Sequence, residues 1–150
     1  MPEKQIKVLL IEDNLDDARL VQEELSGEMD IDLVTVSTLK DALESIGKND
    51  ISVILTDLEL PDSNGIDTFL KIKEKAINMP IIILSGNKDE DLACIAKNKG
   101  AEDYLMKCDV DSKYLQKIIS NAIEKHNLIK ELEKTRQELE KYKQIIEQRQ

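Results

Sequence analysis

One acidic side chain, Asp57, stands at the end of an apolar stretch and is the first candidate for chemistry in this chain. Residues 51–56 (ISVILT) are almost all apolar or β-branched, which is typical of a fully buried strand. Residues 61–65 (PDSNG) then favour a turn. A carboxylate at the exit of a buried central strand lies where open α/β sheets bind ligands. We interpret Asp57 as a nucleophile that accepts a phosphoryl group, although Asp57 taken alone fits a turn-initiating, capping residue better.

Four further polar side chains directly follow strand-like runs: Glu12, Asp13, Ser85 and Lys107. Because the carboxyl ends of parallel strands share one edge of a sheet, we expect these side chains to converge with Asp57. Clustered carboxylates repel one another unless a cation neutralises them, and oxygen ligands without Cys or His favour Mg²⁺. Lys107 suits a phosphoryl oxygen as a point charge, and Ser85 can donate a hydrogen bond to another oxygen of that group.

Strand-like and helix-like segments alternate along the chain. We expect strands at 6–11, 31–36, 51–56, 81–84 and 103–106, and helices at 15–25, 39–46, 66–77, 89–98 and from 111 onward, with Gly47 ending the second helix. Such alternation predicts right-handed crossovers and a parallel sheet with helices on both faces. The predicted fold is α/β: a doubly wound, five-stranded parallel sheet of the flavodoxin-like type, strand order 2-1-3-4-5, with an extended C-terminal helix.

Charge and cysteine content restrict the partners and the setting. The formal net charge is −10, which argues against direct binding of nucleic acid or of an anionic membrane surface. No apolar run approaches the roughly 18 residues of a membrane span. The two cysteines, Cys94 and Cys108, lack CxxC or zinc spacing, so we expect reduced thiols and a cytoplasmic location.

Four segments together resemble the receiver domain of two-component response regulators (CheY-like). The likeness covers residues 5 to 125, and its segments are VLLIEDN at 8–14, ILTDLELPDSNG at 54–65, IILSG at 82–86 and GAEDYLMK at 100–107. The resemblance implies a phosphoacceptor that receives its phosphoryl group from a histidine kinase or a phosphotransfer protein in a phosphorelay. It also implies that the chain catalyses only its own phosphorylation and dephosphorylation and is otherwise no enzyme.

The resemblance further implies a metal site and assigns its ligands. Asp57 is the phosphoacceptor, Asp13 is a direct Mg²⁺ ligand, and Glu12 acts on the ion through a water. The backbone carbonyl of Glu59 is expected to supply a further ligand. The charged side chain of Glu59, two residues past Asp57, is expected to affect how fast the phosphoryl group is lost.

Three more residues match the family's phosphoryl-binding and switch positions. Lys107 is expected to pair with the phosphoryl group, Ser85 to move toward it, and Tyr104 to turn inward when Ser85 moves. The family usually follows the lysine with a proline in a cis peptide, whereas Cys108 follows it here. Because a cis bond before a non-proline residue costs about 3 kcal/mol, we expect this loop to be trans or strained, which leaves the direction of Lys107 open.

Two other functions are compatible with the same residues. An aspartyl-phosphate phosphatase would need a cap that shapes its substrate site, and the sequence contains no insertion that could build one. A receiver-like dimerisation scaffold that is never phosphorylated would fit the replacement of proline by Cys108. A dinucleotide-binding fold is excluded because no GxGxxG motif follows the first strand.

The C-terminal region predicts one long helix. No Pro or Gly follows Gly100, so a helix is expected from Ser112 to Gln150, and at 1.5 Å per residue it would be about 58 Å long. We expect a receiver domain at 1–125 and a projecting helix at 126–150 that serves as a coiled-coil linker to an output domain outside this chain.

The projecting helix carries a heptad pattern. Its apolar seam is Leu128, Leu132, Thr135, Leu139, Tyr142 and Ile146. Glu131 and Glu138 at position g face Arg136 and Lys143 at position e of the next heptad, which is the charge pairing of a parallel dimer. A threonine and a tyrosine weaken the seam. We expect a parallel homodimer through this helix, with a solvated single helix as the alternative.

Overall fold

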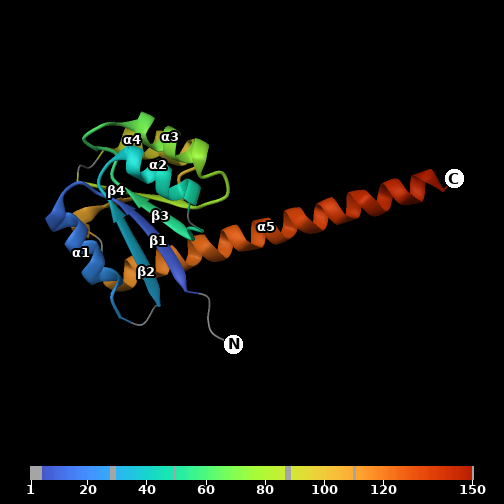
Figure 1. Cartoon of the computed structure of the whole chain (residues 1–150), viewed down its shortest axis with the longest axis horizontal. Coiled ribbons are helices and arrows are strands. Elements are labelled where there is room, and N and C mark those ends of the chain that lie inside the picture. The colour runs from blue at the N-terminus through green and yellow to red at the C-terminus, as the bar shows by residue number, and fades with distance from the viewer. Residues whose placement is uncertain (1–4, 28–29, 49, 87–88, 110, 150) are drawn as a thin grey trace.

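A central sheet with helices on both sides forms the body of the molecule, and one helix runs far beyond it (Figure 1). The structure, a computed structural model, describes residues 5–27, 30–48, 50–86, 89–109 and 111–149. The strands are β1 (Ile6–Ile11), β2 (Ile31–Val36), β3 (Val53–Thr56), β4 (Ile81–Ser85) and β5 (Asp103–Met106). The helices are α1 (Leu15–Leu25), α2 (Leu39–Lys48), α3 (Ile66–Lys75), α4 (Glu90–Asn98) and α5 (Ser112–Gln148).

The five strands are parallel, and their order in the sheet is β2-β1-β3-β4-β5. This confirms the predicted order, including β2 at an edge. The register brings the strand ends into line, because Ile11 pairs with Thr56 and Ser85 pairs with Met106. The residues that follow β1, β3 and β5 therefore share one edge of the sheet.

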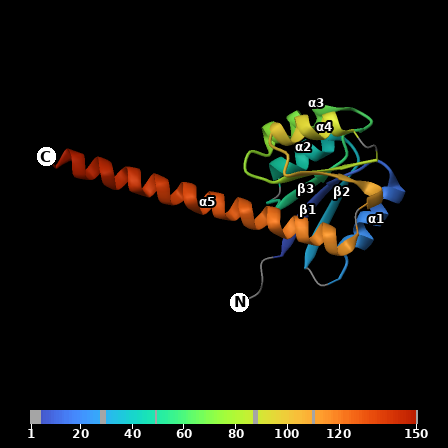
Figure 2. The same cartoon turned by 180° about the vertical axis from the view of Figure 1, so that it is seen from behind.

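Alternating side chains of the central strands form two separate cores. Leu9 and Ile54 face α2, α3 and α4, whereas Val8 and Leu55 face α1 and α5. Figure 2 shows α1 and α5 on the opposite side of the sheet from the other three helices. Because β1 and β3 are buried on both faces, they read as continuous apolar runs in the sequence.

The third strand is shorter than predicted. It begins at Val53 rather than at residue 51. The side chain of Ser52 accepts a hydrogen bond from the backbone N–H of Lys7 at 3.1 Å, and the N–H of Ser52 donates to the Lys7 carbonyl at 2.8 Å. The Lys7 N–H thus bonds to a side chain instead of a backbone carbonyl here, and β3 begins two residues later than predicted.

The predicted ends of α2 and α3 were each wrong by two residues. Gly47, expected to end α2, lies inside the helix, which continues to Lys48. A Cβ atom at Gly47 would lie 3.4 Å from a side-chain carbon of Lys75 on α3, which is an ordinary contact, so this position accepts a helical residue. α3 ends at Lys75 rather than at residue 77, and Ile77 is exposed.

α5 is continuous and divides into a packed and an exposed part. Leu115, Ile119 and Ala122 are buried against the sheet, whereas every residue from 127 to 149 is exposed. Figure 1 shows this second part extending away from the domain. The division between residues 125 and 126 stays a prediction, since the helix itself has no break there.

Among the described helices, none combines the length and the apolar character needed to cross a lipid bilayer.

Candidate functional site

Asp57 directly follows β3 and is held by backbone contacts. Its N–H donates to the carbonyl of Ile11 at 3.0 Å, and its Oδ1 accepts a hydrogen bond from the N–H of Glu59 at 3.1 Å. Thr56, the preceding residue, is fully buried. These contacts fix the carboxylate at the edge where the strands end and leave Oδ2 to face other side chains.

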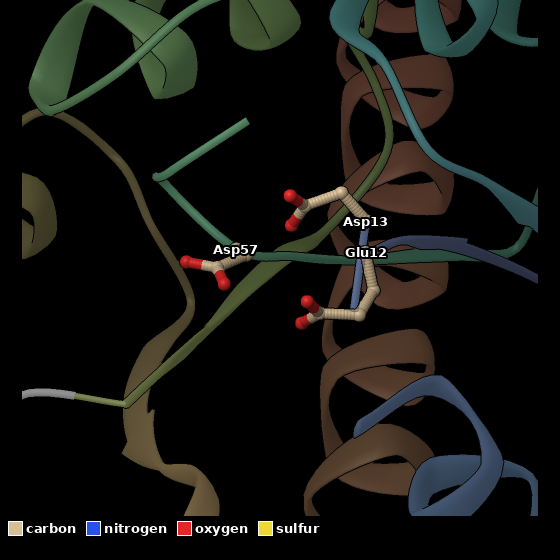
Figure 3. Close-up of side chains that lie close together, drawn as sticks. All are labelled: Glu12, Asp13 and Asp57. Atoms are coloured by element: carbon tan, nitrogen blue, oxygen red, sulfur yellow. The ribbon is translucent and has the colours of Figure 1, made fainter. Parts of the chain in front are cut away.

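Three carboxylates meet at this edge. Figure 3 shows the side chains of Glu12, Asp13 and Asp57 directed into one shared space. One oxygen atom of each lies within 4.8 Å of the others, and Glu12 is buried while Asp13 is exposed. Like charges at this separation repel one another, and an all-oxygen donor set suits a hard divalent cation. The three carboxylates thus converge as predicted, and their arrangement fits a cation such as Mg²⁺.

Lys107 follows β5 and brings a positive charge to the same edge. Its Nζ lies 2.8 Å from Asp57 Oδ2, 2.5 Å from Glu12 Oε2 and 2.9 Å from Asp17 Oδ2. Burial by itself lowers the pKa of Lys107, but the hydrogen bonds to Asp57, Glu12 and Asp17 outweigh burial and raise this pKa above its ordinary value. The ammonium group is therefore protonated at neutral pH and is available to an anionic oxygen.

Glu12 carries an electrostatic cost in this site. Burial, which disfavours the charged form, raises the pKa of Glu12 above its ordinary value, and the nearby charge of Asp57 acts in the same direction. Lys107 and the N–H of Asn14, which donates to Glu12 Oε1 at 3.1 Å, act in the opposite direction without cancelling the effect of burial. An ionised Glu12 is thus best stabilised when a further cation is present.

The two predicted switch residues lie on neighbouring strands. Ser85 ends β4 and is buried, and Tyr104 lies in β5, half-buried against the core under α2, α3 and α4. The hydroxyl of Tyr104 is buried and makes no hydrogen bond to any residue that the structure describes. The movement predicted for these two side chains stays a prediction.

The loop after β5 keeps Lys107 directed into the site although Cys108 replaces the usual proline. Residues Lys107–Asp109 form one turn of 3₁₀ helix, and no cis peptide bond occurs in the described part of the chain. Lys107 Nζ lies 2.8 Å from Asp57 Oδ2, so the loop directs the lysine toward the predicted phosphoacceptor. The thiol of Cys108 is exposed at the surface.

Asp17, on the first turn of α1, was not identified from the sequence. A usable signal existed, because an acidic residue in the first turn of a helix that follows a strand end lies near that same edge of the sheet. Glu59, by contrast, was predicted as a metal ligand through its backbone carbonyl. Its side chain is exposed and lies outside the carboxylate cluster, and the role of its carbonyl stays a prediction.

Comparison with known proteins connects this geometry with one family. The family model described as the response regulator receiver domain matches residues 8–120. The regulatory protein LuxO of Vibrio cholerae is 38% identical over 122 residues, which is 81% of this chain and 26% of LuxO. The chain thus spans about a quarter of the length of that relative.

Solved structures agree with this match. The signal receiver domain of a LuxO protein from Vibrio parahaemolyticus is 30% identical, with a TM-score of 0.77 over 87% of this chain and 98% of that one. The phosphorylated cyanobacterial phytochrome response regulator RcpA is 26% identical, with a TM-score of 0.66 over 78% of this chain and 91% of that one. This chain belongs to the response regulator receiver domain family.

Proposed function

We propose that this chain is a phosphoacceptor in a two-component phosphorelay, with Asp57 taking a phosphoryl group from a phosphohistidine of a kinase or phosphotransfer protein. One observation carries the proposal: the Asp57 carboxylate lies in one cluster with Glu12 and Asp13 and only 2.8 Å from Lys107 Nζ. A carboxylate nucleophile, a cation site and an ammonium group are the parts that phosphoryl transfer needs. The likeness to a phosphorylated response regulator supports the same function.

The transfer itself follows from the positions of these groups. A carboxylate oxygen of Asp57 attacks phosphorus as the bond between phosphorus and the donor imidazole nitrogen breaks. Lys107 stabilises negative charge on a phosphoryl oxygen. A Mg²⁺ ion held by Glu12, Asp13 and Asp57, with the Glu59 carbonyl as a further ligand, would neutralise charge on the transferring group.

The output of the proposed function is a change in contacts rather than turnover of an external substrate. Phosphorylation would draw Ser85 toward the phosphoryl group and Tyr104 inward, which alters the surface around α4 and β5. In this proposal the chain catalyses only its own phosphorylation and dephosphorylation. A cytoplasmic setting agrees with the two exposed free thiols of Cys94 and Cys108.

The exposed part of α5 is proposed to pair with a second copy of the chain in parallel. The large apolar side chains of the predicted seam are exposed in the single chain, among them Leu128, Leu132 and Leu139. Arg136 forms an ion pair with Glu133 of its own helix at 2.6 Å, so it would have to exchange or share this partner to reach Glu131 of a second copy. In the proposal the two receiver domains lie at one end of this helical pair.

Intact mass after incubation with acetyl phosphate and Mg²⁺ tests the phosphoacceptor. We expect the wild-type chain to gain the mass of one phosphoryl group, and Asp57→Asn or a chelator to prevent the gain. Asp67→Asn, which neutralises an exposed acidic residue on α3, is the matched control and should gain the same mass as wild type. A folded wild-type chain that gains no mass and also binds no beryllium fluoride would contradict the proposal and favour a non-phosphorylated scaffold.

A further inference from the structure

Lys107 contacts more carboxylates than the phosphoacceptor chemistry requires. One ammonium group contacts three carboxylates, and the third, Asp17, belongs to α1 and lies outside the set of oxygen ligands that could hold a cation. Glu12 and Asp57 are accounted for by the metal site and the nucleophile. Asp17 therefore needs an explanation of its own.

Asp17 is the partner of Lys107 that lies nearest to solvent. Its side chain is 33% exposed, whereas those of Asp57 and Glu12 are 12% and 3% exposed. The helix holds it in place, since its N–H donates to the Asn14 side chain at 3.1 Å in the N-terminal cap of α1. The backbone of Asp17 is thus fixed, and its carboxylate presents negative charge on the outer side of Lys107 to anything that enters the site from solvent.

A phosphoryl group on Asp57 would compete with the Asp17 carboxylate for Lys107 and would be repelled by it. Its anionic oxygens need the ammonium group of Lys107, and they would be repelled by a carboxylate 2.9 Å from that ammonium. Asp17 and Lys107 both line a cavity of about 270 Å³, whose other walls are mostly apolar: Leu20, Val21, Glu24, Leu84, Cys108 and Leu115. Because Asp17 is partly exposed, its carboxylate can turn toward solvent when Lys107 binds another anion.

We infer that Asp17 is a positioning residue that competes with the phosphoryl group for Lys107 and so favours the resting state of the receiver. This inference rests on the proposed phosphoacceptor function and deepens it. Asp17 pairs with Lys107 when Asp57 carries no phosphoryl group, and this pair must open for Lys107 to bind a phosphoryl oxygen. The free energy of the Asp17–Lys107 pair is therefore subtracted from the stability of the phosphorylated state.

Binding of beryllium fluoride, an anionic phosphoryl mimic, tests the inference in the full chain with Mg²⁺ present. Asp17→Asn keeps the size of the side chain and removes its charge, and we expect it to bind beryllium fluoride about three- to fivefold more tightly than wild type, as for a partly exposed ion pair. Asp16→Asn is the matched control, because Asp16 is an exposed neighbour on the same helix turn and the substitution changes the net charge equally. Asp17→Glu retains the charge and should keep the wild-type affinity.

The outcomes separate this inference from the proposed function. Competition for Lys107 is supported if Asp17→Asn alone binds beryllium fluoride more tightly and is also phosphorylated faster by acetyl phosphate. The difference in affinity between Asp17→Asn and Asp16→Asn should then become smaller at high salt. Equal affinities of the two asparagine variants, or weaker binding by Asp17→Asn, overturn the inference while the phosphoacceptor function stands. A wild-type chain that binds no beryllium fluoride contradicts the proposed function itself.

Discussion

At the scale of single residues, Lys107 decides the charge balance of the site. Its ammonium group touches two carboxylates that are needed for the proposed chemistry, Glu12 and Asp57, and partly neutralises both. The raised pKa of Glu12 shows that Lys107 alone does not offset the cost of burying that carboxylate. A further cation at this cluster would thus favour the ionised form of Glu12.

The buried hydroxyl of Tyr104 is expected to lower the stability of the unphosphorylated domain. Its hydroxyl is buried without a hydrogen-bond partner among the described residues, and such a group costs about 1–3 kcal/mol. We expect Tyr104→Phe to raise the free energy of unfolding of the unphosphorylated chain by about 1 kcal/mol in urea denaturation followed by circular dichroism. Tyr142→Phe, at an exposed position on α5, is the control and should leave stability unchanged. A loss of stability in Tyr104→Phe would mean that the hydroxyl is hydrogen-bonded in solution.

Most of the candidate site could be predicted from the sequence, because the ends of strands can be located from apolar runs that stop at a polar residue. Asp57 and Lys107 each follow an apolar or alternating run, and the parallel sheet then brings them to one edge. Asp17 was missed because it follows a loop rather than a strand. Its place in the first turn of α1 indicates that it lies near the same edge of the sheet, but its contact with Lys107 also depends on how α1 packs against the sheet.

At the scale of whole elements, some helix caps come from distant segments. Thr38 caps α2 locally, as its Oγ1 accepts the N–H of Asp41 at 3.1 Å. The carboxylate of Asp62, in the loop after β3, also accepts the N–H groups of Leu39 and Lys40 at 2.8 and 3.0 Å. These two backbone bonds hold the pKa of Asp62 below its ordinary value. The loop that follows the phosphoacceptor strand is thereby tied to α2, a link that sequence spacing does not reveal.

Two side chains of α5 contact Glu102, the residue just before β5. His126 Nε2 lies 2.5 Å from Glu102 Oε1, at the last position of α5 that is not exposed, and Lys125 Nζ lies 3.5 Å from Glu102 Oε2. Glu102 is two residues before Tyr104. This cluster therefore joins the strand of the predicted switch residue to the point where α5 leaves the domain.

We expect Glu102→Ala to loosen α5 at this point. Loss of a hydrogen bond to a charged, partly buried group should lower the free energy of unfolding by about 1.5 kcal/mol. Hydrogen exchange of the backbone amides at 122–126 should become faster, because the packed end of α5 loses its attachment. Glu124→Ala, at an exposed position on the same helix, is the control. Equal effects of the two variants on both measurements would show that Glu102 does not anchor α5.

At the scale of the whole molecule, α5 belongs to two environments. Its first turns complete the core through buried residues such as Leu115 and Ile119, and its remainder presents apolar side chains to solvent. Figure 2 shows this remainder extending away from the sheet. Packing against the sheet stabilises the first part. Every described residue of the second part from 127 onward is exposed, and isolated helical segments are marginally stable in water. The exposed seam supports the proposed dimer, because the charges along it are those that a second, parallel copy would complement.

Sedimentation equilibrium of the seam variant Leu139→Ala tests this partner directly. Leu139 is exposed in the single chain, and in the proposed dimer both copies become buried. Each copy would contribute about 1.5–3 kcal/mol to the free energy of dimerisation. The alanine variant should therefore dissociate at concentrations at least tenfold higher than wild type. Unfolding of the receiver domain should not change, since Leu139 touches none of its core. Gln137→Ala, two residues away on the face opposite the seam, should dimerise as wild type. A wild-type chain that sediments as a monomer at every concentration, or equal weakening by both variants, would leave α5 as a solvated single helix.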